Sequence, residues 1–170
     1  YDEWARRIAN GAWVGTDVFY QAPLYPYFLG VVYATIGHSL LTVRIIQAAL
    51  GAGSCALLGL TGARFFSLRA GTIAGLALAV YAPAIFFDAL IQKSVLDLFF
   101  LTLSLALMGA LLDSRQSTGR WLALGISMGA LSLTRENALV FVVVIAAWAL
   151  TSRPLPVRRR LGLAATFTAG

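Results

Sequence analysis

The chain has 170 residues, of which 59% are hydrophobic and only 12% charged, and it carries a formal net charge of +6. Soluble domains are about 45–50% apolar and about 25% charged, so this composition excludes a water-soluble globular domain. Long stretches lack any formal charge, among them residues 18–43, 45–63 and 70–87. Because a helix needs about 20 mostly apolar residues to cross a membrane, the sequence predicts an all-α polytopic membrane protein.

Residues 1–40 are predicted to form an extracytoplasmic loop with interfacial helices. Residues 1–11 place apolar side chains on one helical face and charged side chains on the other, and Asn10-Gly11 is a typical helix stop. Because this amphipathic helix is short and has tryptophans beside it, we expect it to lie in the membrane interface.

Prolines delay the second helix of this loop. Pro23 and Pro26 prevent a regular helix through residues 22–25, since proline lacks a backbone N–H and clashes with the preceding turn, although Pro26 could lie in a first turn. We therefore predict a short helix over residues 27–36, which ends at Gly37-His38 and is too short to span the membrane.

Five membrane spans are predicted to follow and to form a bundle over residues 41–151. They cover residues 41–65, 68–91, 96–112, 121–134 and 137–151. In the first span, small residues recur every four positions, at Gly51, Cys55, Gly59 and Ala63. Such a stripe lets backbones approach closely, so we expect Gly51 and Gly59 to face a neighbouring helix.

The connection between the last two spans is very short. Arg135-Glu136 alone separates the two apolar stretches. We predict a hairpin whose tight turn reaches the membrane surface. The alternative is one long helix that contains a buried ion pair.

Positive charge orients the predicted spans. Residues 152–160 contain four Arg and no acidic residue, which predicts a cytoplasmic loop. The other loops with a basic excess are residues 64–69 and 113–120, and those without one are residues 88–97 and 135–136. This alternation places residues 1–40 outside and makes residues 161–170 the start of a further span. Since the basic residues follow topology, we expect no nucleic-acid partner.

Several short motifs occur in an order that resembles a known family. They are Tyr1-Asp2-Glu3-Trp4, Gln21-Ala22-Pro23-Leu24-Tyr25-Pro26 and Leu133-Thr134-Arg135-Glu136-Asn137. In this order the chain resembles the N-terminal part of GT-C membrane glycosyltransferases, in particular the protein O-mannosyltransferases and bacterial relatives such as the lipid A aminoarabinose transferases. The resemblance implies a fragment of a larger GT-C-type bundle in a bacterial cytoplasmic (inner) membrane, with its site facing the periplasm.

The resemblance also implies an activity. A sugar would pass from a polyprenyl-phosphate donor to an extracytoplasmic acceptor, which is a protein, a lipid or a polysaccharide. Asp2 would take the proton of the acceptor hydroxyl, with Glu3 as a helper. Arg135 and Lys93 would hold the leaving phosphate as its charge develops. The slot for lipid and acceptor would be lined by Tyr20, Gln21, Pro23 and Tyr25.

One departure from the family pattern bears on the substrate. Aminoarabinose transferases carry a Glu-Lys pair before the proline segment, where this chain has Gln21-Ala22, and this difference argues against that sugar. The sugar, the acceptor and the oligomeric state stay open, and membrane lipids are the other expected partners. No cofactor is implied. A divalent metal stays open but has no support in the sequence, which contains no cluster of His or Cys.

Each candidate also has a purely structural interpretation. Asp2 and Glu3 stand four residues before arginines, the favoured spacing for helical ion pairs worth about 0.2–0.5 kcal/mol. The remaining structural interpretations are Lys93 paired with Asp97, Asp88 with Gln92, Arg135 with Glu136, Arg44 as a snorkelling anchor, and His38 as a turn residue.

Two other classes of membrane protein fit part of the pattern. A multi-pass transporter or permease subunit also has glycine-rich spans, but it places polar or broken helices near the membrane midplane, whereas polar residues here gather at the outer ends. A polyprenyl-linked polysaccharide ligase or polymerase shares the lipid-phosphate chemistry but depends on a large late outer loop. The order of motifs therefore favours the glycosyltransferase.

Overall fold

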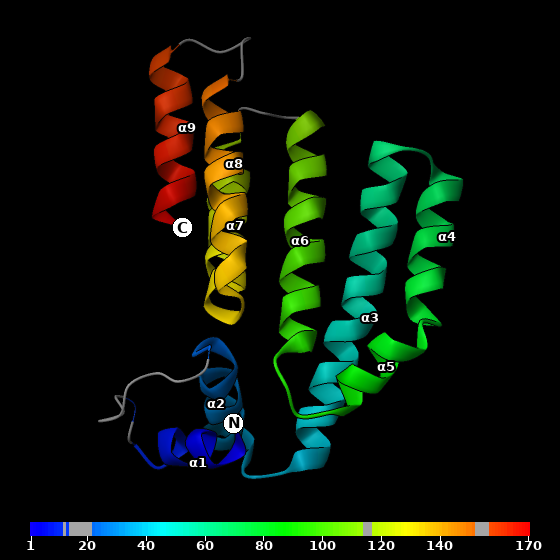
Figure 1. The fold of residues 1–170 in the computed structure, drawn as a ribbon, viewed down its shortest axis with the longest axis vertical. Helices are drawn as coiled ribbons and strands as arrows, with labels where there is room; N and C mark the ends of the chain where they lie inside the picture. Colours follow the sequence, from blue (N-terminus) through cyan, green and yellow to red (C-terminus); the bar gives the residue numbers. More distant parts are fainter. Residues whose placement is uncertain (12, 14–21, 114–116, 152–156) are drawn as a thin grey trace.

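The computed structural model describes residues 1–11, 13, 22–113, 117–151 and 157–170, and the regular elements in these ranges are all helical. In chain order they are α1 (Asp2–Ala9), α2 (Leu24–Ile36), α3 (Leu40–Phe65), α4 (Leu68–Ala79), α5 (Ala82–Ala89), α6 (Ser94–Asp113), α7 (Thr118–Thr134), the 3-10 turn η1 (Glu136–Ala138), α8 (Leu139–Thr151) and α9 (Val157–Ala169). The long helices run along one axis, and α1 lies across their end (Figure 1). The predicted all-α architecture is confirmed.

Among the described residues, two helices are long and apolar enough to cross a membrane, α3 over Leu40–Phe65 and α6 over Ser94–Leu112. The pair α4 and α5 adds a third crossing if the two helices form one bent span. The helices α7 and α8, which we predicted as further spans, have 17 and 13 residues. Both are shorter than the roughly 20 residues that a perpendicular crossing needs, so helix length supports two to three of the five predicted spans.

The predicted span over residues 68–91 is not one straight helix, because the chain breaks between α4 and α5. The two helices meet at 51°. Tyr81 is extended, with φ −75° and ψ 102°, and Pro83 lies in the first turn of α5. Within a continuous helix the proline ring would clash with the carbonyl of Ala79, so the helix restarts where the missing N–H costs nothing.

The helix α2 begins earlier than predicted. It starts at Leu24, with Pro23 as its N-cap and Pro26 in its first turn. The first N–H groups of any helix have no intrahelical partner, so both prolines are tolerated there. The predicted end is confirmed, because Gly37 follows α2 with a φ of 96° that suits glycine.

The connection between α7 and α8 is a turn, as predicted. Arg135 ends α7 in an extended conformation, with φ −138° and ψ 110°, and η1 then leads into α8. The alternative of one uninterrupted long helix is therefore excluded. Figure 1 shows α8 drawn over α7, and the two helices pack together in the bundle.

The small-residue stripe of α3 packs against α4, which confirms the expected helix contact. A Cβ atom at Gly59 would lie 3.4 Å from the backbone oxygen of Gly71. From the other side, a Cβ at Gly75 would lie 2.9 Å from the backbone oxygen of Cys55. The backbones of the two helices thus touch along these glycines, as in membrane helix pairs that associate through small residues.

We expect Gly71→Ala to destabilise the protein and Gly162→Ala to have little effect. A Cβ at Gly71 would overlap the Gly59 carbonyl and lie 3.0 Å from Ala63 Cα, whereas a Cβ at Gly162 meets nothing within 4 Å. Overpacking of this kind costs about 1–3 kcal/mol. Thermal unfolding of the full-length protein in detergent measures the difference, and equal midpoints for the two variants would show that the α3–α4 contact is loose.

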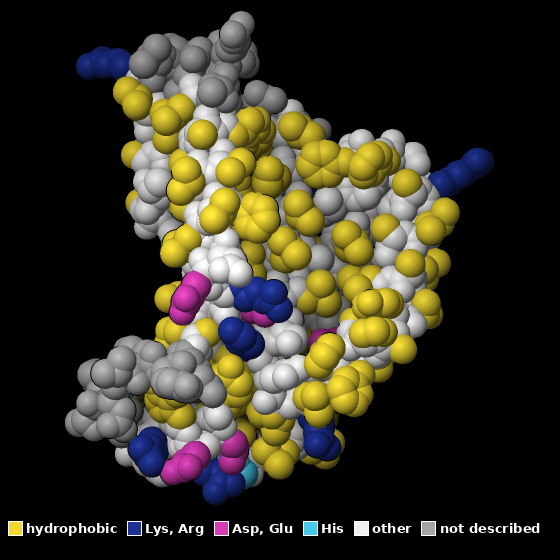
Figure 2. Space-filling model, viewed as in Figure 1, with side chains coloured by type: hydrophobic (Ala, Val, Ile, Leu, Met, Phe, Trp, Pro, Cys, Tyr) yellow, Lys and Arg dark blue, Asp and Glu magenta, His cyan; other side chains and the backbone are white. Residues whose placement is uncertain are grey.

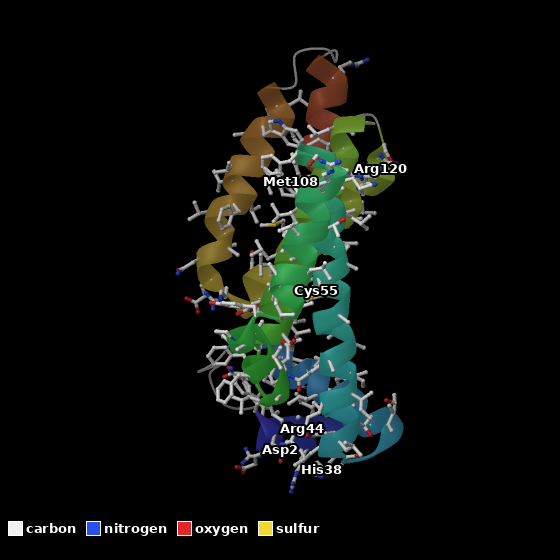
Figure 3. All side chains as sticks on the ribbon, turned by 90° about the vertical axis from the view of Figure 1, so that its right-hand side faces the viewer. Asp2, His38, Arg44, Cys55, Met108 and Arg120 are labelled. Carbon is white, nitrogen blue, oxygen red and sulfur yellow. The ribbon has the colours of Figure 1, made fainter. Side chains whose placement is uncertain are left out.

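The helices α1 and α2 occupy one end, while the α3–α4 turn and the ends of α6 and α8 occupy the other (Figure 1). In Figure 3, Asp2 and His38 lie at the first end and Arg120 at the second. The acidic motif of the sequence therefore lies at the end formed by α1 and α2, where a site can form.

Candidate active site

Asp2 lies at the centre of a polar cluster that joins α1, α2 and the turn before α3. We call it the Asp2 cluster, and its members are Asp2, Arg6, Tyr33 and His38. The hydroxyl of Tyr33 donates to Asp2 Oδ1 at 2.6 Å, and His38 Nε2 lies 3.0 Å from the same oxygen. Arg6 pairs with Oδ2 at 3.1 Å. The side chain of Asp2 remains 37% exposed, so a substrate can reach it.

Local structure explains this placement. Asp2 is the first residue of α1, where negative charge is favoured by the helix dipole, and Arg6 follows one turn later. The positive φ of Gly37 turns the chain back, so that the ring of His38 lies 4.6 Å from that of Tyr33. Buried Ala5 and Ile8 fix α1 on the end of the bundle.

The cluster keeps Asp2 ionised at neutral pH. The hydrogen bond from Tyr33 lowers the pKa of Asp2 below its ordinary value, and this outweighs partial burial, which raises it. The contacts with His38 and Arg6 lower it further. Burial, and next the bond to Asp2, raise the pKa of Tyr33, so its hydroxyl stays a donor. Asp2 is thus a carboxylate held by donors.

Sequence reasoning missed His38. We interpreted it as a turn residue, whereas the structure places it against Asp2, 36 positions away in the chain. The predicted ion pairs within α1 are confirmed, since Asp2 pairs with Arg6 and Glu3 pairs with Arg7 at 2.8 Å. Glu3 is 82% exposed and faces Arg7, outside the Asp2 cluster.

A second group, the Arg135 cluster, joins the start of α6 to the end of α7. Its members are Lys93, Asp97, Thr134 and Arg135. Arg135 Nε donates to Asp97 Oδ2 at 2.8 Å, and Lys93 Nζ donates to the backbone oxygen of Thr134 at 2.7 Å. The structure thus brings together the two cations that we predicted to hold phosphate.

The Arg135 cluster corrects two structural interpretations made from the sequence. Asp97 pairs with Arg135, not with Lys93, and Glu136 is not the partner of Arg135. The reason is the extended backbone of Arg135, which directs its side chain back toward α6 and away from η1.

A cavity of about 380 Å³ lies beside Arg135. Its lining includes Ser94, Asp97, Leu131, Arg135, Asn137 and Phe141. The side chain of Arg135 is 63% exposed, while Oδ1 of Asp97 is buried and has no hydrogen-bond partner among the described residues. Figure 2 shows Lys and Arg side chains gathered in a hollow between the α1–α2 end and the helices above it. A largely apolar cavity with an exposed guanidinium in its lining suits a ligand that combines an apolar chain with an anionic group.

The predicted slot residues have different environments. Tyr25 is fully buried in the core that joins α1, α2 and α6, and its ring packs edge-on against Tyr1 at 5.1 Å. Pro23 is half-buried at the start of α2. Tyr20 and Gln21 lie outside the described residues.

Tyr1 lies between the two clusters. Its pKa is raised by burial and then by the charge of Asp97, which places its phenol within the field of the Arg135 cluster. Asp2, the next residue, belongs to the other cluster. Between described residues, no hydrogen bond or ion pair joins Asp2 directly to Lys93 or Arg135.

A larger groove of about 560 Å³ runs between α3 and the bent pair α4–α5. Arg44, Cys55 and Asp88 are among its lining residues, and Asp88 points at Gly51, where a Cβ atom would overlap its carboxylate. The predicted pair of Asp88 with Gln92 is therefore not formed. Among the residues that the structure describes, no group of three or more His, Cys, Asp or Glu could hold a metal ion.

The fold and these clusters define a helical membrane protein that carries the Asp2 carboxylate in one cluster and the two cations Lys93 and Arg135 in the other. The family described as dolichyl-phosphate-mannose-protein mannosyltransferase matches residues 20–169, and the chain belongs to this family. It is a membrane glycosyltransferase of the GT-C type. His38 and the Arg135 cluster lie inside the matched region, whereas Asp2 and Glu3 precede it. Comparisons with curated proteins and with solved structures gave no match.

Proposed function

We propose that this chain forms part of an enzyme that moves a sugar from a polyprenyl-phosphate donor to an extracytoplasmic acceptor, which is a protein, a lipid or a polysaccharide. Membership of the family supports the glycosyltransferase class. The observation that carries the finer proposal is the cavity beside Arg135, where apolar walls adjoin an exposed guanidinium.

The Arg135 cluster is suited to the leaving phosphate. When the bond between the anomeric carbon and phosphate breaks, negative charge develops on the phosphate oxygens. Arg135 uses Nε for Asp97, which leaves its terminal nitrogens to face a phosphate. The Lys93 ammonium adds positive charge nearby. Its hydrogen bond goes to the Thr134 carbonyl, which is neutral and does not cancel that charge.

Asp2 is suited to activate the acceptor. It is ionised at neutral pH, it is partly exposed, and Tyr33 and Arg6 fix both carboxylate oxygens. A carboxylate of this kind can take the proton of an attacking hydroxyl, a role worth typically about 10²–10⁴-fold in rate. Glu3, one residue further along α1, would assist in orienting the acceptor.

The proposed site faces the exterior of a bacterial cytoplasmic (inner) membrane. The α3–α4 turn and Arg120, which belong to basic loops predicted to be cytoplasmic, lie at the end of the bundle opposite to Asp2. Sugar transfer would then occur at the outer surface, where the amphipathic α1 lies in the interface.

Mass spectrometry of lipid that co-purifies with the full-length protein tests the proposed donor. We expect a polyprenyl phosphate carrying one sugar, enriched over an unrelated polytopic protein purified from the same membranes. Transfer of labelled mannose from dolichyl-phosphate-mannose into membrane acceptors then serves as the turnover assay. Absence of both the lipid and the transfer would contradict the proposed donor class.

A further inference from the structure

The contacts of His38 Nε2 require two different proton states. This atom lies 3.0 Å from Asp2 Oδ1 and 3.1 Å from Arg6 Nε. Arg6 can donate only to a bare nitrogen, whereas Asp2 can accept only from a protonated one. Nε2 therefore has a hydrogen-bond partner in both states: Asp2 when it carries a proton, and Arg6 when it does not. This is the arrangement of a group that can gain and lose a proton without moving.

The other neighbours of Asp2 cannot take a proton from it. Arg6 has no acceptor atom, and the Tyr33 hydroxyl already donates to Oδ1. The lowered pKa of Asp2 means that it does not retain a proton at neutral pH. The ring of His38, in contrast, has a nitrogen that can accept a proton and that lies 3.0 Å from Asp2 Oδ1.

We propose that His38 is the proton acceptor for Asp2, which restores the carboxylate after each sugar transfer. This inference rests on the proposed role of Asp2 as the base. His38 is 38% exposed, so a proton that reaches its ring can leave to water. The charged and titratable groups that contact the ring are Asp2 and Arg6 on α1 and Tyr33 on α2.

The proton balance of the step is complete. The acceptor oxygen forms a bond to the anomeric carbon as the bond from that carbon to the phosphate oxygen breaks. The hydroxyl proton passes to Asp2 and the polyprenyl phosphate leaves as an anion. Asp2 then transfers the proton to His38 Nε2, and the ring releases this proton to water, so that Nε2 is bare again for the next turnover. No oxidant, reductant or further reactant is consumed.

Turnover of dolichyl-phosphate-mannose by full-length His38 variants tests the relay. We expect His38→Ala to lower turnover at least about 10-fold and added imidazole to restore most of it, because free imidazole can take the proton in the space left. His38→Gln can still donate a hydrogen bond to Asp2 but cannot take its proton, so we expect it to be as slow as His38→Ala.

Two controls separate a structural role from the relay. Asp2→Asn should not respond to imidazole, and the elution profile in detergent shows whether each variant is folded. Full turnover of His38→Gln would overturn the relay and leave only an orienting hydrogen bond. Wild-type turnover of His38→Ala would also overturn it. If Asp2→Asn itself is fully active, or if the wild type neither carries a polyprenyl-phosphate sugar nor turns over this donor, the proposed function fails instead.

Discussion

Asp2→Asn in the full-length protein should lower turnover at least about 10²-fold at saturating donor while it leaves donor binding almost unchanged. Asparagine keeps the size of aspartate and still accepts the hydrogen bond from Tyr33, but it cannot take a proton. The phosphate of the donor is assigned to the Arg135 cluster, which no hydrogen bond or ion pair between described residues links to Asp2. The measurement is the turnover assay together with a donor titration.

Arg7→Gln is the matched control for this variant. It removes the other i,i+4 ion pair of α1, in which Arg7 and Glu3 are 63% and 82% exposed. If Asp2 only stabilises α1, both variants should have small and similar effects, since such pairs contribute a few tenths of a kcal/mol. Near-normal turnover of Asp2→Asn would remove Asp2 from the chemistry.

The pH dependence follows from the same contacts. The Tyr33 hydrogen bond lowers the pKa of Asp2 in the folded protein, so the docking of α1 gains stability from this carboxylate at neutral pH. That contribution is lost as pH falls from the ordinary carboxyl range through the lowered pKa.

Local patterns predicted much of the fold. The end of α1, the long α3, the small-residue stripe and the turn at Arg135 each depend on residues adjacent in sequence or one helical turn apart. The errors occurred at prolines. Pro26 is accepted in the first turn of α2, whereas Pro83 breaks the span predicted over residues 68–91. A proline pattern alone does not determine which N–H groups lack partners, because that depends on where the helix begins.

The candidate site was less predictable because its contacts are long-range. Asp2 meets His38 across 36 positions, and Arg135 meets Asp97 across 38. The sequence identified Asp2, Lys93 and Arg135 as charged residues with an unusual location, but it carries no signal for which of them pair. The glycine at position 37 was the available hint, since its positive φ is what returns His38 to α1.

Arg135→Gln should weaken donor binding at least about 10-fold, because charge-assisted hydrogen bonds contribute about 1.5–3 kcal/mol each. Turnover at saturating donor should fall less than in Asp2→Asn, since Arg135 acts on the phosphate and Asp2 on the acceptor. The measurement is a titration with dolichyl-phosphate-mannose, followed by the turnover assay at high and low donor concentration. Loss of Arg135 also leaves the buried Asp97 carboxylate without its partner, which alone destabilises a protein.

A double variant separates donor binding from this loss of stability. In Arg135→Gln/Asp97→Asn both charges are gone, so no unpaired carboxylate remains in the cavity, and donor binding should stay weak while the folded yield recovers. Glu136→Gln is the matched control, because Glu136 is the adjacent charged residue, is exposed and lies outside the Arg135 cluster. If the double variant binds the donor as tightly as the wild type, the Arg135–Asp97 pair is a structural contact between α6 and α7, and the phosphate is held elsewhere.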